Sequence, residues 1–234
     1  MSDEPQKTKI DQRSLQETYN EIAAEFDGTR YKPWPQTIDF INELPDNCSI
    51  LDLGCGNGRN SLYIASLARG FKILAIDFSL KMLRIAINKT QQQKLDNNIE
   101  FIQGDIVKLP FTTSSIDNAI FIATLHHLPS EELRLQSLND LERCLKPDGK
   151  AFISVWDFEQ ERFENELAKQ LKEPPTETEF GDVFVPWTGK RGANAQRFYH
   201  LFYKDEFESL FNKTNFKIEK LFRAADNYHA VLRK

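Results

Sequence analysis

Ile50-Leu51-Asp52-Leu53-Gly54-Cys55-Gly56-Asn57-Gly58-Arg59-Asn60 is the stretch that decides the fold of this chain. An apolar run breaks into three glycines separated by single residues, and an amphipathic segment follows. This order predicts a strand, a tight turn and the start of a helix. Glycine lets a backbone take positive φ and approach a bulky ligand closely. The turn is therefore expected to hold a nucleoside-type cofactor at a helix N-terminus.

Acidic residues stand at or near the ends of this apolar run and of two others. Asp52 lies two positions before the first glycine, Asp77 ends the run 71–77, and Asp105 with Ile106 ends the run that starts at residue 99. A carboxylate at the C-terminal end of a strand suits bidentate hydrogen bonds to ribose hydroxyls. The spacing G-x-G-x-G lacks the third glycine position of the dinucleotide fingerprint, which disfavours NAD.

Apolar strand runs alternate with helical segments between residues 49 and about 156, and this alternation predicts an α/β fold with a parallel sheet wrapped on both faces. We expect a seven-stranded, mostly parallel, doubly wound (Rossmann-like) sheet with an antiparallel C-terminal strand pair. The expected strands are 49–53, 72–77, 99–103, 117–122, 150–156, 215–222 and 228–233, and the expected helices include 59–68, 79–89, 130–145 and 204–212.

Domain organisation is expected to be simple. Residues 1–12 are polar and contain a proline, which predicts a mobile tail, and residues 13–234 are expected to form a single domain. Residues 146–150 read as a turn between a helix and the fifth strand. The polar segment 157–181, with Pro174-Pro175, is expected to be a loop or a poorly ordered excursion.

Composition narrows the class of protein. The formal net charge of −5 does not favour a nucleic-acid binder unless a local patch or a partner supplies positive charge. Three cysteines without a C-x-x-C pair argue against a disulfide scaffold or a self-contained zinc site, so we expect no metal. No apolar stretch approaches the roughly 20 residues that span a bilayer, and the N-terminus lacks a signal-peptide core. The expected location is the reducing cytoplasm, away from membranes.

The ordered set of glycines and acids resembles the class I S-adenosylmethionine-dependent methyltransferases. This resemblance implies that Gly54, Gly56 and Gly58 wrap the methionine part of S-adenosylmethionine, and that Asp77 holds the ribose. It also implies that Asp105 and Ile106 flank the adenine, and Asp52 is assigned to the same cofactor site.

Segments outside the cofactor motifs resemble the tRNA wobble-uridine carboxymethyl methyltransferases, the family that includes the methyltransferase domain of AlkB-like tRNA enzymes. The resemblance runs from about Tyr19 to the C-terminus, and residues 157–181 show no matching motif. It implies esterification of the carboxylate of 5-carboxymethyluridine at the wobble position of the tRNA anticodon loop. The segments that carry it are 29–35, 124–127, 182–187, 197–202 and 223–228.

Residue chemistry suits this reaction. A carboxylate is ionised at neutral pH and needs no strong general base, so the protein must chiefly supply orientation and proximity. Arg30 and Arg197 are the first candidates for holding the acceptor carboxylate or a neighbouring phosphate, because guanidinium groups bind both in a bidentate manner. His127 is expected to orient the uracil or its carboxymethyl arm. His126 is expected to be structural, because adjacent side chains in an extended segment point in opposite directions.

Aromatic residues offer a surface for the wobble base. At least one of Trp34, Trp156, Trp187 and Tyr199 is expected to stack on it, and Trp156 and Tyr199 are assigned to the catalytic site. Trp34 stands between prolines and suits a packing role equally well. The basic segment 190–192 fits either a solvated loop or a contact with tRNA phosphate.

The resemblance also implies a partner. The family typically works with a small zinc-binding activator protein that joins the sheet by strand addition, and the third strand, near Phe101-Ile102, is the expected exposed edge. Two alternatives remain open. A small-molecule methyltransferase, acting on a quinone precursor or a metabolite carboxylate, is favoured by the acidic composition. A non-catalytic scaffold is disfavoured by the intact glycine and aspartate set.

Overall fold

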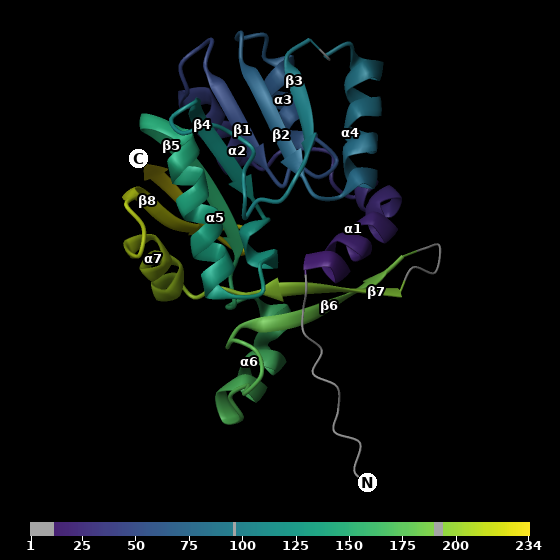
Figure 1. Ribbon diagram of the computed structural model, residues 1–234. Coiled ribbons are helices and arrows are strands. Elements are labelled where there is room, and N and C mark those ends of the chain that lie inside the picture. The colour runs from purple at the N-terminus through teal and green to yellow at the C-terminus, as the bar shows by residue number, and fades with distance from the viewer. Residues whose placement is uncertain (1–11, 96, 190–193) are drawn as a thin grey trace.

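A seven-stranded sheet forms the centre of the computed structural model, which describes residues 12–95, 97–189 and 194–234 (Figure 1). The strand order is β3-β2-β1-β4-β5-β9-β8. The strands are β1 (Ser49–Leu53), β2 (Lys72–Asp77), β3 (Ile99–Gln103), β4 (Ile116–Ile122), β5 (Leu145–Trp156), β8 (Lys217–Ala224) and β9 (Asn227–Arg233).

Strand direction confirms the expected topology. β1 to β5 run parallel, whereas β9 is antiparallel to both β5 and β8. β1 lies between β2 and β4, so the chain order reverses at the β1–β4 boundary. In open α/β sheets, ligands bind beyond the carboxyl ends of the strands at such a switch point. The topology therefore places a site at the ends of β1 and β4.

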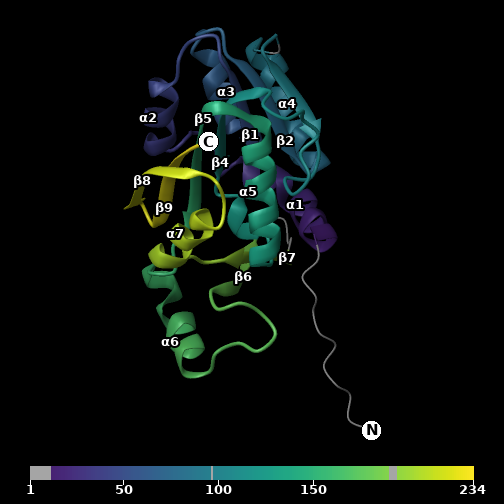
Figure 2. The same ribbon diagram turned by 60° about the vertical axis from the view of Figure 1, so that its left-hand side comes forward.

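Helices cover both faces of the sheet, as the alternating pattern predicts. Side chains alternate between the faces along each strand: Ile50 and Ile73 pack against one pair of helices, and Leu51 and Leu74 belong to the cluster of another pair. The first pair is α2 (Pro35–Glu43) and α3 (Arg59–Ser66), and the second is α5 (Glu131–Cys144) and α7 (Lys204–Asn212). In Figure 1, α5 and α7 lie in front of the sheet, and Figure 2 shows α2 and α3 on the opposite side.

Two further helices complete the wrapping. α4 (Leu80–Gln93) begins at Ser79, whose hydroxyl accepts the N–H of Met82, as an N-cap does. α1 (Gln12–Asp27) packs against α4 and lies near the carboxyl end of β2 (Figure 1). Among the helices of the described residues, none has the length and apolar character that crossing a membrane requires.

β5 begins earlier than the sequence analysis predicts. Residues 146–150 belong to this strand, where the register jumps: Ile116 pairs with Leu145, but Asn118 already pairs with Lys150. The extra residues form a bulge, in which Asp148 has a φ of +63°. Pro and Gly here interrupt the ladder without ending the strand.

The segment expected to be a loop contains a helix. After the short 3-10 helix η2 (Glu161–Phe163), α6 (Glu164–Lys172) follows at once. Its only apolar positions with bulk are Leu167 and Leu171, and Leu171 is 65% exposed. This weak apolar face explains why the sequence pattern did not predict the helix. At the N-terminus, residue 12 begins α1, and the rest of the expected tail, residues 1–11, lies outside the described residues.

A separate two-stranded sheet lies beside the main body. β6 (Asp182–Thr188) pairs antiparallel with β7 (Asn194–His200), and together with α6 it extends below the main sheet in Figure 1. Phe158, Val183 and Leu201 form a small apolar cluster that joins this arm to the end of β5. β7 also contacts α1, so the arm closes one side of the site.

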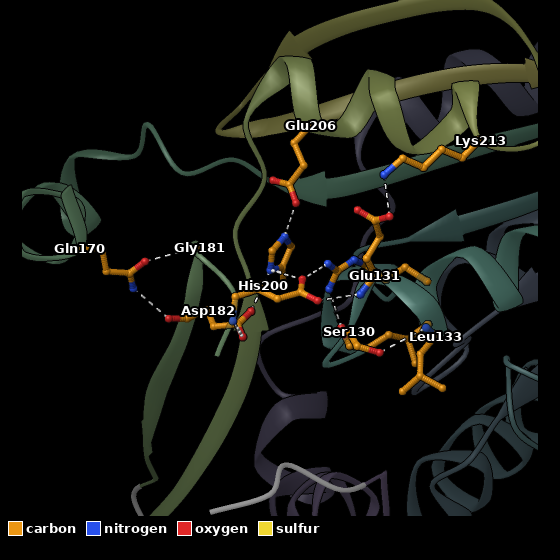
Figure 3. A network of polar contacts seen from close by, with 12 residues as sticks. Ser130, Glu131, Leu133, Gln170, Gly181, Asp182, His200, Glu206 and Lys213 are labelled. Atoms are coloured by element: carbon orange, nitrogen blue, oxygen red, sulfur yellow. Dashed lines mark hydrogen bonds and ion pairs between the residues drawn. The ribbon is translucent and has the colours of Figure 1, made fainter. Parts of the chain in front are cut away.

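His200 at the end of β7 lies within a buried polar network (Figure 3). Its Nδ1 lies 2.7 Å from Asp182 Oδ1, and its Nε2 lies 2.7 Å from Glu206 Oε1 on α7. Glu179 pairs with the buried Arg134 of α5. Glu179, Asp182 and His200 have the residue types of a metal site, but their donor atoms are already engaged by the protein. The network therefore ties the arm to α5 and α7.

Candidate functional site

A cavity opens at the carboxyl ends of β1, β2 and β4, where the topology places a site. The turn between β1 and α3 forms one wall, and α1 contributes Leu15, Tyr19 and Phe26 to another. The short 3-10 helix η1 (Leu125–His127), which follows β4, lines the cavity with both of its histidines. Nine of the predicted site residues line it: Arg30, Gly54, Gly56, Asp77, Asp105, Ile106, His127, Trp156 and Tyr199.

The three glycines of the turn have positive φ but different surroundings. Their φ values lie between +55° and +76°. A Cβ on Gly54 would overlap the Thr124 side chain, and a Cβ on Gly58 would lie 2.8 Å from Ala86 Cβ. A Cβ on Gly56 would meet no heavy atom within 4 Å. Gly54 and Gly58 are thus required by packing, whereas Gly56 leaves open space on the cavity floor.

Asp77 ends β2 with its carboxylate at the cavity wall. Its Oδ2 accepts the N–H of Gly56 and its Oδ1 accepts the N–H of Ser79, both at 2.8 Å. Burial raises the pKa of Asp77 to about 6, although the two N–H groups favour the charged form. The bonds fix the carboxylate beside the open floor above Gly56, where it can accept further hydroxyl donors.

Asp52 lies behind the turn and does not line the cavity. It is 1% exposed, its Oδ2 accepts the Ser61 hydroxyl at 2.6 Å, and burial raises its pKa to about 6. Asp52 and Gly58 shape the turn and the start of α3 from inside the protein, and their assignment to the cofactor site stays a prediction. Asp105, by contrast, borders the cavity and accepts the N–H of Val107 at 2.9 Å.

These residues fit S-adenosylmethionine. The space above Gly56 would receive the methionine part, Asp77 would accept the ribose hydroxyls, and Asp105 and Ile106 would border the adenine. The fit rests on a turn whose one open glycine faces the cavity and on a buried carboxylate fixed beside it.

The two histidines of η1 have different partners. His127 Nδ1 lies 2.9 Å from the Phe198 carbonyl, so this nitrogen donates, and Nε2 lies 2.8 Å from the Tyr19 hydroxyl. Burial lowers the pKa of His127 to about 4, which keeps the ring neutral. Both nitrogens are thus engaged by the protein, and contact with a uracil would require breaking one bond. The role assigned to His127 at the uracil stays a prediction.

His126 has a free donor. Its Nδ1 accepts the backbone N–H of Trp156 at 3.0 Å, and Nε2 is buried with no hydrogen-bond partner among the described residues. Burial lowers the pKa of His126 well below its usual value, so its single ring proton belongs on Nε2. The expectation of a purely structural His126 assumed an extended segment, whereas η1 is helical and both rings line the cavity.

Arg30 and Arg197 lie in different environments. Arg30 lines the cavity and has no carboxylate partner among the described residues. Arg197 lies on β7, is 7% exposed and does not border the cavity. Its Nη1 donates to the Tyr199 hydroxyl at 2.9 Å, and its guanidinium lies 4.9 Å from the Trp187 ring centroid. This side chain supports Tyr199 from behind, and the grip of Arg197 on the acceptor stays a prediction.

Trp156 has a stacked partner on each side. The Tyr199 ring lies parallel to it, with 4.1 Å between centroids, and Arg162 Cζ lies 4.2 Å from its centroid. Two groups at such distances must occupy opposite faces of one ring. Stacking of a base on Trp156 is therefore blocked while Arg162 stays in place. The basic segment 190–192 lies outside the described residues.

Several residues at the site were missed by the sequence analysis. The sequence pattern predicts a core position for Tyr19, because its spacing on α1 is that of an apolar face. Arg59 borders the cavity, 5.1 Å from the Trp34 ring centroid, and only its place after the last glycine could have indicated this. Arg162 lies in a polar segment that carries no motif, so no sequence signal pointed to it.

Known proteins define the class. The family described as "Methyltransferase domain" matches residues 44–215, and this chain belongs to it. A solved SAM-dependent methyltransferase from Methanosarcina mazei is 22% identical, with a TM-score of 0.72 over 87% of this chain and 98% of that one. A Haloferax volcanii putative methyltransferase, solved with the Trm112 methyltransferase activator, gives a TM-score of 0.67 at 15% identity, covering 94% of this chain and 95% of that one. Both share the fold.

Several curated relatives of this chain share one enzyme name. The chain is 28% identical to the tRNA (carboxymethyluridine(34)-5-O)-methyltransferase of Schizosaccharomyces pombe, across 94% of this chain and 96% of that protein. It is 35% identical to the Arabidopsis thaliana protein of the same name, over 65% of this chain and 35% of that protein. Mouse, Xenopus and Macaca relatives are also longer, and the chain spans 23%, 41% and 24% of their lengths.

Proposed function

We propose that this protein transfers the methyl group of S-adenosylmethionine to the carboxylate of 5-carboxymethyluridine at the tRNA wobble position. The similarity to the S. pombe enzyme of that name, over nearly the whole of both chains, carries the proposal. The cavity supports it, because the glycine turn and Asp77 share one space with the guanidinium of Arg30, which forms no ion pair with a carboxylate of the described residues. We place the reaction in the cytoplasm, which suits the three buried free cysteines.

The chemistry requires no proton transfer. S-adenosylmethionine supplies a methyl group activated by its positively charged sulfur. An oxygen–carbon bond forms at the acceptor carboxylate while the carbon–sulfur bond breaks. A carboxylate with a reference pKa of about 4 is already ionised at neutral pH, so no general base is needed. The lowered pKa values of His126 and His127 agree with this, because they make both rings weak bases.

The residues that face the acceptor serve to hold it. Arg30 can form a bidentate pair with the carboxylate at the cavity mouth. The Nε2–H of His126 can donate to an acceptor oxygen from the cavity wall, since no group of the described residues bonds to it. His127 keeps Tyr19 of α1 and Phe198 of β7 together around the same space. Holding the carboxylate in line with the methyl group supplies the proximity on which the rate depends.

The exposed edge of β3 is the proposed docking site of a small zinc-binding activator protein. β3 is the last strand on its side of the sheet, and none of its residues is fully buried, unlike those of β1 and β2. Asn98 and Gly104 bond to β2, so the N–H groups of Ile99, Phe101 and Gln103 point away from it. Such an edge accepts a strand from a partner. The Haloferax neighbour was solved with an activator, which supports this proposal.

The proposed function is tested with labelled S-adenosylmethionine and three acceptors: tRNA carrying 5-carboxymethyluridine, the same tRNA with plain uridine, and small carboxylic acids. We expect label only in the first, and mild alkali should release it, because esters hydrolyse where N- and C-methyl groups do not. Asp77→Ala should abolish cofactor binding, whereas Arg30→Ala should spare it and remove transfer. Label in the small acids but not in tRNA would contradict the proposal and favour the small-molecule alternative.

A further inference from the structure

A second cavity adjoins the first and shares Arg30, Trp34 and Trp156 with it. Its other side is formed by Arg162 of η2 and by Asn227 at the start of β9. The two cavities are therefore neighbours with a common wall. A ligand whose reacting group enters the first cavity must place its neighbouring groups in or beside the second.

Three guanidinium groups border the two cavities: Arg30 borders both, Arg59 the first and Arg162 the second. Among the described residues none of the three forms an ion pair with a carboxylate. Each lies over an aromatic ring: Arg30 Cζ is 5.6 Å from the Phe26 centroid, Arg59 Cζ is 5.1 Å from Trp34, and Arg162 Cζ is 4.2 Å from Trp156. Stacking holds the planes of the groups and leaves their edge donors available. Six other arginines of the described residues are paired with carboxylates: Arg13, Arg69, Arg134, Arg143, Arg223 and Arg233.

The unpaired positive charge is notable in a chain of net charge −5. Glu161 and Asp226 also border the second cavity, but among the described residues neither forms an ion pair with Arg30 or Arg162. Asp226 instead lies 3.9 Å from Arg223. Burial lowers the pKa of Arg59 to about 10, and the nearby charge of Arg30 adds to this effect. The charge of Asp52 opposes this lowering at Arg59, and the charge of Asp226 acts in the same way on Arg162. Among the described residues neither carboxylate forms an ion pair with these two groups, and like charges held close together favour an anionic ligand.

Asn227 supplies an independent observation. It is 5% exposed, its Nδ2 donates to the Ala225 carbonyl, and its Oδ1 is buried with no hydrogen-bond partner among the described residues. A buried polar atom without a partner costs stability unless a ligand or water satisfies it, and the residue that carries this atom borders the second cavity. The second cavity thus combines guanidinium donors for an anion with one acceptor for a hydroxyl group.

We infer that the second cavity binds a phosphodiester group next to the nucleoside whose carboxylate is methylated, with Arg162 as its main contact. The inference rests on the proposed function, because the first cavity then holds that nucleoside. A phosphodiester matches the planar fork of Arg162, and the adjoining ribose hydroxyl matches Asn227 Oδ1. The acceptor is therefore part of a polynucleotide, and a free nucleoside leaves this cavity without a ligand.

Binding of an anticodon stem-loop RNA to the full chain, followed by fluorescence anisotropy across a salt series, tests the inference. Removing one phosphate contact on a single strand lowers the slope of log affinity against log salt by about 0.7. We expect Arg162→Gln to show that loss and to bind about tenfold more weakly at low salt, as a lost charged hydrogen bond of about 1.4 kcal/mol does. Arg162→Lys should keep the slope, because the charge remains.

Arg233→Gln is the matched control, since it removes the same charge at the far end of β9. It should bind with the wild-type slope and affinity. With tRNA as acceptor, Arg162→Gln should raise KM and leave kcat at saturation unchanged, and its affinity for S-adenosylmethionine should not move. Wild-type slope and affinity in Arg162→Gln would overturn the phosphate site, whatever the wild-type activity. Absence of methyl transfer by the wild type would instead contradict the proposed function.

Discussion

At the residue scale, different glycines of the turn serve protein packing and ligand binding. Gly56→Ala places a methyl group in space that only a ligand would use, whereas Gly54→Ala forces one into Thr124. Both carry the strain of positive φ, about 1–2 kcal/mol. We expect Gly54→Ala to lower the free energy of unfolding by clearly more than that amount. Gly56→Ala should remain folded and lose about 5- to 150-fold in cofactor affinity, as overpacking by about 1–3 kcal/mol implies.

Thermal unfolding and titration calorimetry measure the two effects separately. Gly28→Ala serves as the control for replacing a glycine, because its added Cβ would meet only one atom, at an ordinary 3.5 Å, and its φ is not in the positive region. Equal stability losses in Gly54→Ala and Gly56→Ala, with cofactor affinity unchanged in the second, would contradict the assignment of Gly56 to the ligand.

Asp77 should make cofactor binding depend on pH. Its folded pKa of about 6 lies above the usual value, and only the ionised carboxylate accepts two ribose hydroxyls. Affinity for S-adenosylmethionine should therefore be constant above about pH 7 and fall about tenfold per unit well below pH 6. Calorimetric dissociation constants between pH 5 and 8 check this. Asp52→Asn should keep the dependence, since Asp52 has a similar pKa but does not line the cavity; loss of the dependence in that variant would assign the titration to Asp52.

His126 should position the acceptor through Nε2–H. His126→Phe keeps a ring of similar shape and removes the donor. We expect kcat/KM for tRNA to fall about 10- to 150-fold, the effect of losing a hydrogen bond of about 1.5–3 kcal/mol to a charged group. Cofactor affinity should stay at the wild-type value. A parallel fall in cofactor affinity would show that the ring shapes the whole cavity and does not act on the acceptor.

At the element scale, the network around His200 joins β6 and β7 to α5 and α7. Burial opposes its charge, but hydrogen bonds with Asp182 and Glu206 prevail and raise the pKa of His200. A raised histidine pKa stabilises the fold below the unfolded value of about 6.5, and this contribution is lost as pH rises through the folded pKa. The contribution is about 1.5–3 kcal/mol, as for hydrogen bonds to charged groups.

Urea unfolding of the wild type and His200→Gln at pH 6 and pH 9 checks this prediction. The wild type should lose more free energy of unfolding between the two pH values than the variant, because only the wild type carries the titrating ring. Identical pH dependence in the two proteins would contradict a charged His200 in the fold.

Elements with strong patterns could be predicted from the sequence, and those with weak patterns could not. The apolar runs of β1 and β2 are buried along most of their length, so sequence alone located them. α6 buries little apolar surface, and residues 146–150 look like a turn because a bulge also uses Pro and Gly. At the site, the glycines and Asp77 follow a local motif. The residues that surround His126 and Arg162 come from segments distant in sequence. No local sequence pattern predicts such contacts.

At the scale of the whole molecule, charge is unevenly distributed. The chain is acidic overall, yet Arg30, Arg59 and Arg162 border two adjoining cavities, and within the described ranges none of them pairs with a carboxylate. Local charge of this kind reconciles an acidic protein with a polyanionic substrate, because exposed charges farther away are screened beyond about 8 Å at physiological salt. An activator docked on the β3 edge would extend the contact surface without changing the cavity itself.

The most direct test of the central claim is mass spectrometry of the nucleosides released from tRNA after incubation with the protein, S-adenosylmethionine and the activator. The proposed function predicts that 5-carboxymethyluridine at the wobble position is converted to its methyl ester, and that Asp77→Ala prevents the conversion. Unchanged 5-carboxymethyluridine, despite measurable cofactor binding by the wild type, would contradict it.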